Sequence, residues 1–264
     1  DEKNSILFGE EGKKKFESLP CTPLQDGNRF FAQSGHFVFR KLEQDHETYM
    51  HFDAAPLGYL SIAAHGHADA LSFILHVDGH PVIVDPGTYS CYMDKNLRDY
   101  FVSTLAHNTI CVNGKNQAEQ IGRTMWQNHY KVNVISCDEA AGEVTASHDG
   151  YAPEGVIHTR QVRYDRESDE FTITDSLLCA KNAVLEIPFH LHPDASVELR
   201  GSTAEISVPG CRRVVLELDS KLSYAVRNDG WYSEHFDDKV PTKFLYAKAE
   251  CSGNTDFVTK VKII

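Results

Sequence analysis

Apolar and polar residues alternate along most of the chain after Phe30, with the two-residue period of a β-strand that buries one face. Alternating stretches cover residues 36–40, 48–52 and 71–77, and the last is followed by Asp78-Gly79 and an apolar run over 81–85. An Asp-Gly pair between two apolar runs is typical of a two-residue hairpin turn. Asn113-Gly114 repeats this signal after residues 108–112. The first half of the chain is therefore predicted to form antiparallel hairpins.

The second half has the same character, because turn residues recur about every 8–12 residues, the spacing of a β-sandwich or barrel. These turns are predicted at 149–150, 166–169, 209–210 and 228–230. No apolar stripe of helical period extends beyond two turns. The pattern predicts an all-β fold, a large antiparallel β-sandwich. Its candidate strands in this half are 131–136, 143–147, 158–164, 170–176, 183–190, 196–199, 204–208, 213–218, 243–250 and 256–264.

The first 27 residues differ from the rest. They carry a run of three lysines at 13–15, prolines at 20 and 23, and Asp26-Gly27, a mixture typical of a linker. We predict a linker or lead-in segment over 1–27 and one β-sandwich domain over 28–264, with a candidate sub-boundary near Pro193. The chain begins at Asp1 and not at Met, so we expect a removed leader or a longer parent protein.

Composition excludes several classes of protein. The chain has 264 residues, of which 41% are hydrophobic, so it can bury a core and is not disordered. Its 26 Lys and Arg against 38 Asp and Glu give a net charge of −12, which argues against binding nucleic acid or an anionic membrane. No apolar run reaches the ~18–20 residues of a membrane span. The seven cysteines form no CxxC motif and show no disulfide framework.

Histidine is frequent, with 14 residues, and the densest polar motif is His65-Gly66-His67-Ala68-Asp69. In an extended segment two histidines at i and i+2 point the same way, so both can face one site. Asp85 and His107 follow, and the set can build a zinc site with an open position. Spacing alone also fits two unconnected surface histidines, because a hairpin at Asp78-Gly79 pairs Asp85 with Ser72. The His65–Asp69 motif must leave the strand for His67 to meet Asp85.

A cupin also carries His-x-His on β-strands, but this chain departs from the cupin pattern. The cupin motif requires a glutamate about four residues after the second histidine, where this chain has Leu71. Its second motif requires a histidine shortly after Pro-x-Gly, whereas Pro86-Gly87 is followed by Thr88-Tyr89-Ser90.

A larger set of ordered motifs between Phe30 and Trp126 resembles the heparinase II/III-like family of polysaccharide lyases. The motifs are FDAAPLG at 52–58, HGHADALSF at 65–73, VDPGTYS at 84–90, RDYF at 98–101, ST at 103–104, AHNT at 106–109 and VNG at 112–114. Beyond Trp126 the resemblance thins to Tyr151, residues 189–193 and residues 230–233.

The resemblance implies an N-terminal (α/α) toroid followed by a large antiparallel β-sandwich, and this chain corresponds to the sandwich alone. By family likeness His67, Asp85 and His107 are the ligands of one structural zinc per chain, and His65 faces the substrate cleft. Such a zinc holds the sheet and the catalytic histidine in place.

Lyases of this kind cleave uronic-acid polymers by β-elimination. The uronate carboxylate is neutralised, a base takes the C5 proton, and an acid protonates the departing O4. We predict that His65 neutralises the carboxylate or takes part in proton transfer, and that Tyr100 is the acid, with Tyr89 and Tyr92 as alternatives that better fit buried structural roles. Arg98 either meets the anionic sugar or pairs with Asp94 or Asp99. His190 and His192 are expected to pack in the core or at an edge.

Two functional hypotheses remain from the resemblance. In the first, the chain is the β-sheet domain of a zinc-containing lyase and is inactive without its toroid. In the second, it is a non-catalytic carbohydrate-binding or exopolysaccharide-processing module with a structural metal. A generic metal-dependent hydrolase is disfavoured by the family match. The expected partners are an anionic polysaccharide such as heparan sulfate or alginate and the missing toroid, with no nucleic acid and no membrane insertion. The expected location is periplasmic or secreted.

Overall fold

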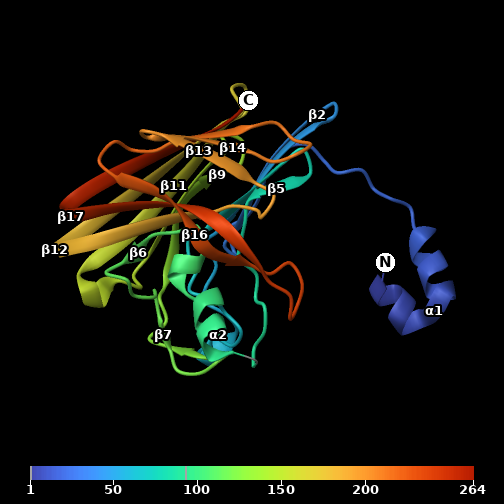
Figure 1. Ribbon diagram of the computed structural model, residues 1–264, viewed down its shortest axis with the longest axis horizontal. Helices are drawn as coiled ribbons and strands as arrows, with labels where there is room; N and C mark the ends of the chain where they lie inside the picture. Colours follow the sequence, from blue (N-terminus) through green and yellow to red (C-terminus); the bar gives the residue numbers. More distant parts are fainter. Residues whose placement is uncertain (1, 93) are drawn as a thin grey trace.

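Two antiparallel sheets make up most of the computed structural model, which describes residues 2–92 and 94–264 (Figure 1). The first sheet has five strands in sequential order. They are β1 (Arg29–Phe31), β2 (His36–Glu43), β3 (His46–Asp53), β4 (Phe73–Val77) and β5 (His80–Ile83). The predicted hairpin between β4 and β5 is confirmed, because Val77 pairs with His80 and Asp78 and Gly79 both have positive φ, as a type I′ turn requires.

The second sheet has ten strands and is built around two long ones, β12 (Glu170–His190) and β17 (Val240–Ile263). Its path runs β13-β14-β15-β17-β12-β11-β10-β9, while β16 also pairs with β17 and β6 with β12. The other strands are β6 (Cys111–Val112), β9 (Val132–Asp138), β10 (Glu143–His148), β11 (Val156–Asp165), β13 (Ser196–Arg200), β14 (Thr203–Ser207), β15 (Val214–Glu217) and β16 (Ser223–Tyr232). A separate two-stranded ribbon joins β7 (Glu119–Gln120) and β8 (Trp126–Gln127).

Three details of the strand prediction are wrong. Residues 170–176 and 183–190 belong to one strand, since β12 continues through a register shift between Cys179 and Ala183. The predicted strands at 243–250 and 256–264 are likewise joined in β17. The turn expected at 228–230 lies within β16, where the register shifts between Arg227 and Gly230. Polar and glycine residues at these places mark bulges, which the sequence pattern cannot distinguish from turns.

The two sheets pack face to face, which confirms the predicted sandwich. Phe39 of β2 meets the rings of Tyr164 and Phe171 from the second sheet, and Phe73 of β4 meets Phe189 of β12. These side chains belong to one continuous buried cluster, which also contains residues on both sides of Pro193.

Helices are few. Helix α1 (Glu2–Glu17) is kinked at Gly9 and lies apart from the sheets, where Figure 1 shows it in blue. Helix α2 (Lys95–Phe101) begins at Asp94, whose carboxylate accepts hydrogen bonds from two backbone N–H groups of the first turn. Three single 3-10 turns complete the set: η1 (Leu60–Ile62), η2 (Thr104–Ala106) and η3 (Ala152–Glu154). Among the described residues, no helix has the length and apolar character needed to cross a bilayer.

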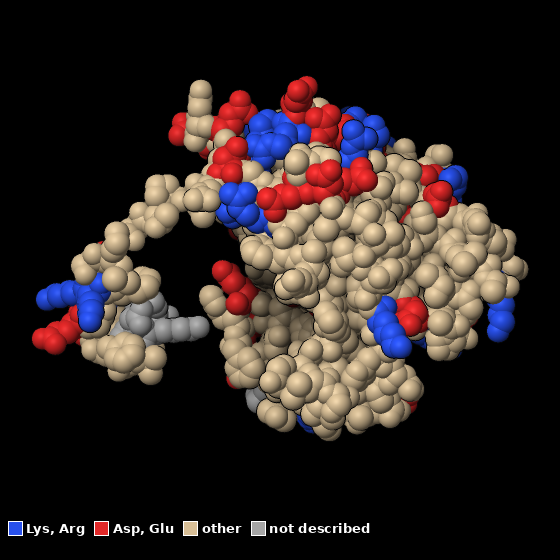
Figure 2. Space-filling model, turned by 180° about the vertical axis from the view of Figure 1, so that it is seen from behind, with Lys and Arg blue, Asp and Glu red and all other residues tan. Residues whose placement is uncertain are grey.

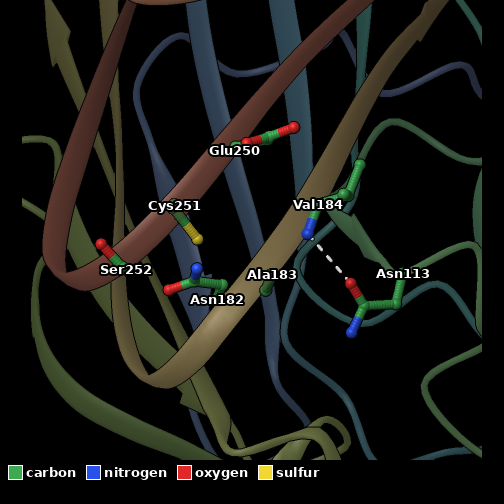
Figure 3. A pocket seen from close by; sticks show the side chains of 7 residues that line it. All are labelled: Asn113, Asn182, Ala183, Val184, Glu250, Cys251 and Ser252. Atoms are coloured by element: carbon green, nitrogen blue, oxygen red, sulfur yellow. Dashed lines mark hydrogen bonds between the residues drawn. The ribbon is translucent and has the colours of Figure 1, made fainter.

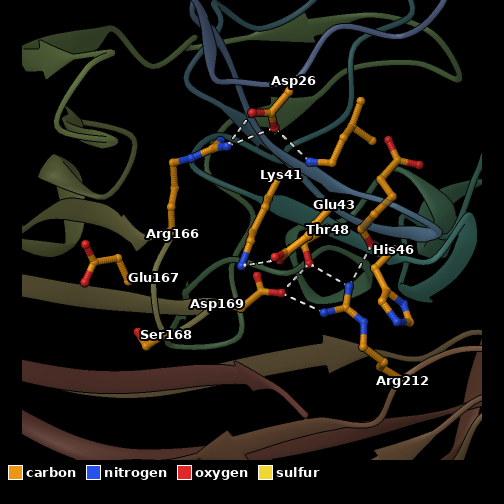
Figure 4. Close-up of polar contacts among 12 residues, drawn as sticks. Asp26, Lys41, Glu43, His46, Thr48, Arg166, Glu167, Ser168, Asp169 and Arg212 are labelled. Carbon is orange, nitrogen blue, oxygen red and sulfur yellow. Dashed lines mark hydrogen bonds and ion pairs between the residues drawn. The ribbon is translucent and has the colours of Figure 1, made fainter.

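A polar cluster ties the β4–β5 turn to the second sheet. Arg212 donates to both carboxylate oxygens of Asp78. It also binds Asp169 and Thr48, as Figure 4 shows. Burial raises the pKa of Asp78, but hydrogen bonds from the Arg212 side chain and from the backbone of Arg212 and Glu47 outweigh it and lower the pKa to about 2. The carboxylate is therefore held in its charged form.

We predict that Arg212→Met lowers the free energy of unfolding at pH 7 by about 2 kcal/mol, because it removes the main cation that stabilises Asp78. The pKa of Asp78 is about 2 in the folded state against 3.8 for the free residue. Its contribution is therefore present above about pH 4 and is lost as the pH falls toward 2. Urea unfolding between pH 2 and 7 should show that the free energy of unfolding falls less steeply with decreasing pH in the variant than in the wild-type protein.

The control is Arg166→Met, which breaks a more exposed pair with Asp26 and should cost less than about 1 kcal/mol. Equal losses in both variants, or an unchanged acid dependence in Arg212→Met, would contradict the assignment.

Candidate metal centre

His67, Asp85 and His107 meet at one place although they come from three separate segments. His67 lies in the loop before β4, Asp85 follows β5, and His107 ends the turn η2. One ligand atom from each lies within 4.8 Å of the other two. The structure therefore brings together the three residues that the sequence selected as metal ligands.

The distances among these atoms suit a small divalent ion. His67 Nδ1 lies 3.1 Å from His107 Nε2, and His107 Nε2 lies 3.4 Å from Asp85 Oδ2. In a tetrahedral zinc site with bonds of 2.0–2.1 Å, neighbouring ligand atoms are about 3.3 Å apart.

Hydrogen bonds to neighbouring backbone groups orient two of the ligands. His107 is buried, and its Nδ1 donates to the carbonyl of Ser103 at 2.8 Å, so Nε2 carries the lone pair. Asp85 Oδ1 accepts from the backbone N–H of Gly87 at 2.8 Å, which directs Oδ2 toward His107. A carboxylate oxygen then faces an imidazole lone pair, and two acceptors in this position require a cation or a proton between them. The donor set fits zinc.

His67 is held in its neutral form. Burial lowers the pKa of this imidazole well below its usual value, and the charges of His107 and Arg98 lower it further. Its Nε2 lies 3.5 Å from the hydroxyl oxygen of Thr88. Neutral imidazole is the form that binds a metal ion.

The segment carrying the two histidines has left the strand, as the sequence analysis required for His67 to meet Asp85, so the two side chains do not share the single face of an extended segment. His65 adopts a left-handed backbone conformation (φ 60°), and its N–H donates to Thr124 O at 2.9 Å. Gly66 packs so closely on Gly58 that an added Cβ would lie 2.7 Å from the Gly58 nitrogen. Trp126 Nε1 donates to the Gly66 carbonyl at 2.8 Å. This tight loop leaves His65 exposed while His67 turns inward toward the metal residues.

Asp69, the last residue of the motif, is not in the metal cluster among the described residues. Burial raises the pKa of its carboxyl well above the usual value, and the charges of Asp53 and Asp85 raise it further.

Asn108 connects the ligand-bearing segments from behind. Its Nδ2 donates to Phe73 O at 2.8 Å and to Val84 O at 2.9 Å, and its Oδ1 accepts from the His190 N–H at 2.7 Å. Asn108 follows His107, and Val84 precedes Asp85, so this hydrogen bond holds two of the ligand-bearing segments together. In the sequence, Asn108 stands out only as part of the strand-like run 108–112 and of the AHNT motif at 106–109.

Arg160 and Asp175 form a buried ion pair beneath these loops. Arg160 donates to Asp175 at 2.7 and 2.9 Å, and its Nη1 donates to Leu71 O at 2.6 Å and Asn108 O at 2.7 Å. His158 contacts the same carboxylate at 2.7 Å. Burial raises the pKa of Asp175, but Arg160 and His158 outweigh it and hold it below its usual range. Alternation along β11 places Arg160 on the inward face, and this alternation is the sequence signal that could have identified it.

Arg98 and Tyr100, the other predicted site residues, lie on α2. Arg98 is 1% exposed, and its Nε donates to Arg123 O at 2.8 Å, while Asp99 instead pairs with Lys95. The Tyr100 hydroxyl accepts the Trp231 N–H at 3.0 Å, and burial raises its pKa to about 12. Neither residue contacts the metal cluster directly through a hydrogen bond among the described residues.

The alternative tyrosines have different surroundings. Tyr89 stacks on Phe101, with the ring centroids 5.6 Å apart, whereas Tyr92 is 71% exposed and does not have the buried role expected for it. His190 is buried against Phe244, as predicted, and burial lowers its pKa to about 4.

Comparison with known proteins agrees with this architecture. The family model described as "Heparinase II/III-like, C-terminal" matches residues 25–258. Heparan sulfate lyase HepC from Pedobacter heparinus superposes with a TM-score of 0.73 at 15% identity, covering 98% of this chain and 39% of that one. The heparinase III BT4657 gene product superposes at 0.75 and 18% identity, with 98% and 40% covered. The chain thus spans about 40% of the length of these structures. No curated protein matches it in sequence.

We predict that Arg160→Met lowers the free energy of unfolding by about 3–5 kcal/mol, because it leaves the Asp175 charge buried without its main partner. Urea unfolding at pH 7 measures the loss. Arg163→Met, on the same strand but with an exposed side chain, is the matched control and should change stability by less than about 0.5 kcal/mol. Similar losses at the two positions would contradict the role given to the ion pair.

Proposed function

Because the chain belongs to the heparinase II/III-like, C-terminal family, we propose that it is the zinc-binding β-sandwich part of a lyase that cleaves uronic-acid polysaccharides. The observation that carries this proposal is the meeting of His67, Asp85 and His107 from three separate loops. Family membership supports the lyase class, and the cluster supports a metal site within the fold.

His67 Nδ1, His107 Nε2 and Asp85 Oδ2 would hold one zinc ion per chain. When bound, zinc supplies a fixed positive charge that ties the three loops together. Its role is structural, since the ligands belong to the loops that also support His65. His65 itself is exposed and two residues from His67, so the same loop presents it to a substrate.

The proposed reaction is β-elimination at a uronic acid. The proton leaves C5, the bond from C4 to O4 breaks, and the departing O4 receives a proton. We assign His65 to the uronate carboxylate or to proton transfer. We assign Tyr100 to protonation of O4, because a pKa of about 12 keeps its proton at neutral pH. Its hydroxyl oxygen accepts from Trp231, so the hydroxyl hydrogen is available to donate.

Arg98 would act on an anionic sugar through its charge rather than through direct contact, because its side chain is buried under backbone carbonyls.

The remaining cleft wall would come from an N-terminal toroid, whose residues complete the site. The charge on the surface of this domain is consistent with a substrate site shared with a toroid. In Figure 2, side chains of both signs intermix along the upper edge of the visible face, and the net charge is −12. This domain alone should bind a polyanion weakly.

Heparan sulfate and alginate are the proposed substrates, and the proposed location is periplasmic or secreted. The second candidate is a non-catalytic carbohydrate-binding or exopolysaccharide-processing module with a structural metal. The two functions differ in whether any unsaturated product forms when the toroid is present.

We predict that the purified chain binds about one zinc per molecule and that His107→Ala or Asp85→Asn weakens this binding about 100-fold or more, since each removes a ligand. Elemental analysis and competition with a chelating dye measure stoichiometry and affinity, and metal removal should lower the Tm. His80→Ala, at the start of β5, is the matched control. Metal-free protein with an unchanged Tm after zinc addition would rule out the site.

We predict that the chain alone yields no unsaturated uronate from heparan sulfate or alginate, because the toroid residues are absent. A longer protein that includes the toroid should yield it, and His65→Ala should reduce the rate about 10²–10⁴-fold. Ultraviolet absorbance of the unsaturated product measures the reaction. Product from the chain alone would contradict the division of the site, and no product from the longer protein would favour the non-catalytic module.

A further inference from the structure

Two cysteines on the longest pair of strands lie in contact. The sulfur atoms of Cys179 on β12 and Cys251 on β17 are 2.9 Å apart, and each side chain is 5% exposed. Carbon atoms in van der Waals contact lie about 3.5–4.0 Å apart, and sulfur is a larger atom than carbon. Among the described residues, no other pair of cysteine sulfurs makes such a contact, and Cys111 and Cys211 contact carbonyl oxygens instead.

The register of the sheet produces this contact. Cys179 pairs with Gly253 and Ala183 pairs with Cys251, so three residues of β12 stand opposite one residue of β17. The bulge shortens the distance between two same-face positions that lie diagonally across the ladder. Because 72 residues separate the cysteines, their spacing along the chain gave no sign of the pair.

A cavity of about 500 Å³ opens beside the pair (Figure 3). It is lined by the bulge residue Asn182, by Cys251 and Ser252, and by Asn113, whose Oδ1 accepts from the Val184 N–H at 2.9 Å. Figure 3 shows the Cys251 sulfur pointing toward Asn182. The cavity borders the Cys251 side chain, whereas Cys179 is not part of its lining.

We propose that Cys179 and Cys251 are a disulfide-forming pair that covalently joins β12 to β17. A disulfide needs a sulfur separation of about 2.05 Å, so the atoms must approach by only about 0.9 Å. The co-reactant is a small-molecule disulfide such as oxidised glutathione. One protein thiolate attacks it and releases one glutathione thiol, and the second protein thiolate then displaces the other. Two protein thiols are oxidised, one glutathione disulfide is reduced, and each released thiol takes one proton.

The disulfide stabilises the fold and does not form and break rapidly in the folded protein. Burial, together with the neighbouring Cys179, raises the pKa of Cys251 to about 12, so little thiolate forms in the folded state. Oxidation should therefore be fast during folding and slow afterwards. Reduction of the formed bond should also be slow, because its sulfur atoms are buried.

Peptide mapping tests the pair directly. The wild-type chain is refolded with oxidised and reduced glutathione, alkylated with N-ethylmaleimide in denaturant, and digested with trypsin. Peptides 167–181 and 249–260 each contain a single cysteine. We expect them to appear as one linked species, two hydrogen atoms lighter than the free pair. Recovery of both peptides in alkylated form, or linkage of either to another cysteine, would overturn the proposal.

Thermal unfolding provides a second measurement. Reduction of the refolded protein should lower the Tm by roughly 5–10 °C, because the bond closes a long loop in the unfolded chain. Cys179→Ser should abolish this sensitivity, and Cys111→Ser, a buried cysteine on the neighbouring strand β6, should retain it. Equal sensitivity in the two variants would also overturn the proposal. If Cys179→Ser does not fold, the peptide map of the wild-type chain still decides.

Discussion

The ion pair between Arg160 and Asp175 is the interaction on which the candidate site depends. Both residues lie on the second sheet, yet Arg160 reaches the carbonyls of Leu71 and Asn108 in the loops of the first. A fully buried guanidinium is tolerated only because its donors are paired and its charge is compensated by Asp175. Asn108 extends this support to the residue before Asp85. These hydrogen bonds hold the loops that carry His67, Asp85 and His107 in place without a metal ion.

Alternation along the chain was sufficient to predict the sandwich, and Asp78-Gly79 was sufficient to place one hairpin. The motif residues also identified His67, Asp85 and His107, which lie together. What the chain pattern could not provide was the backbone path between them. His65 is left-handed because of the tight contact between Gly58 and Gly66, and Trp126 secures that contact from a distant ribbon. Asn108, Arg160 and the cysteine pair act through partners far away in sequence, which periodicity does not reveal.

The arrangement also separates two roles within one short motif. His67 turns inward, where burial keeps it neutral, and His65 remains exposed at the surface. Residues two positions apart in a regular strand would share one environment. Leaving the strand gives each imidazole its own surroundings, one beside Asp85 and His107 and one exposed to solvent. An acidic domain can in this way present a localised site without a broad positive surface.

The position of β17 has a consequence for how the chain folds. This strand pairs with β12, β15 and β16, all of which precede it in sequence. Until β17 arrives, the second sheet has a gap in its middle, with β12 and β15 both presenting unpaired edges. Such long-range pairing is slow, and exposed edges invite association between chains. During synthesis on the ribosome the domain must therefore remain incomplete until its central strand has emerged, a period in which a chaperone would be of most use.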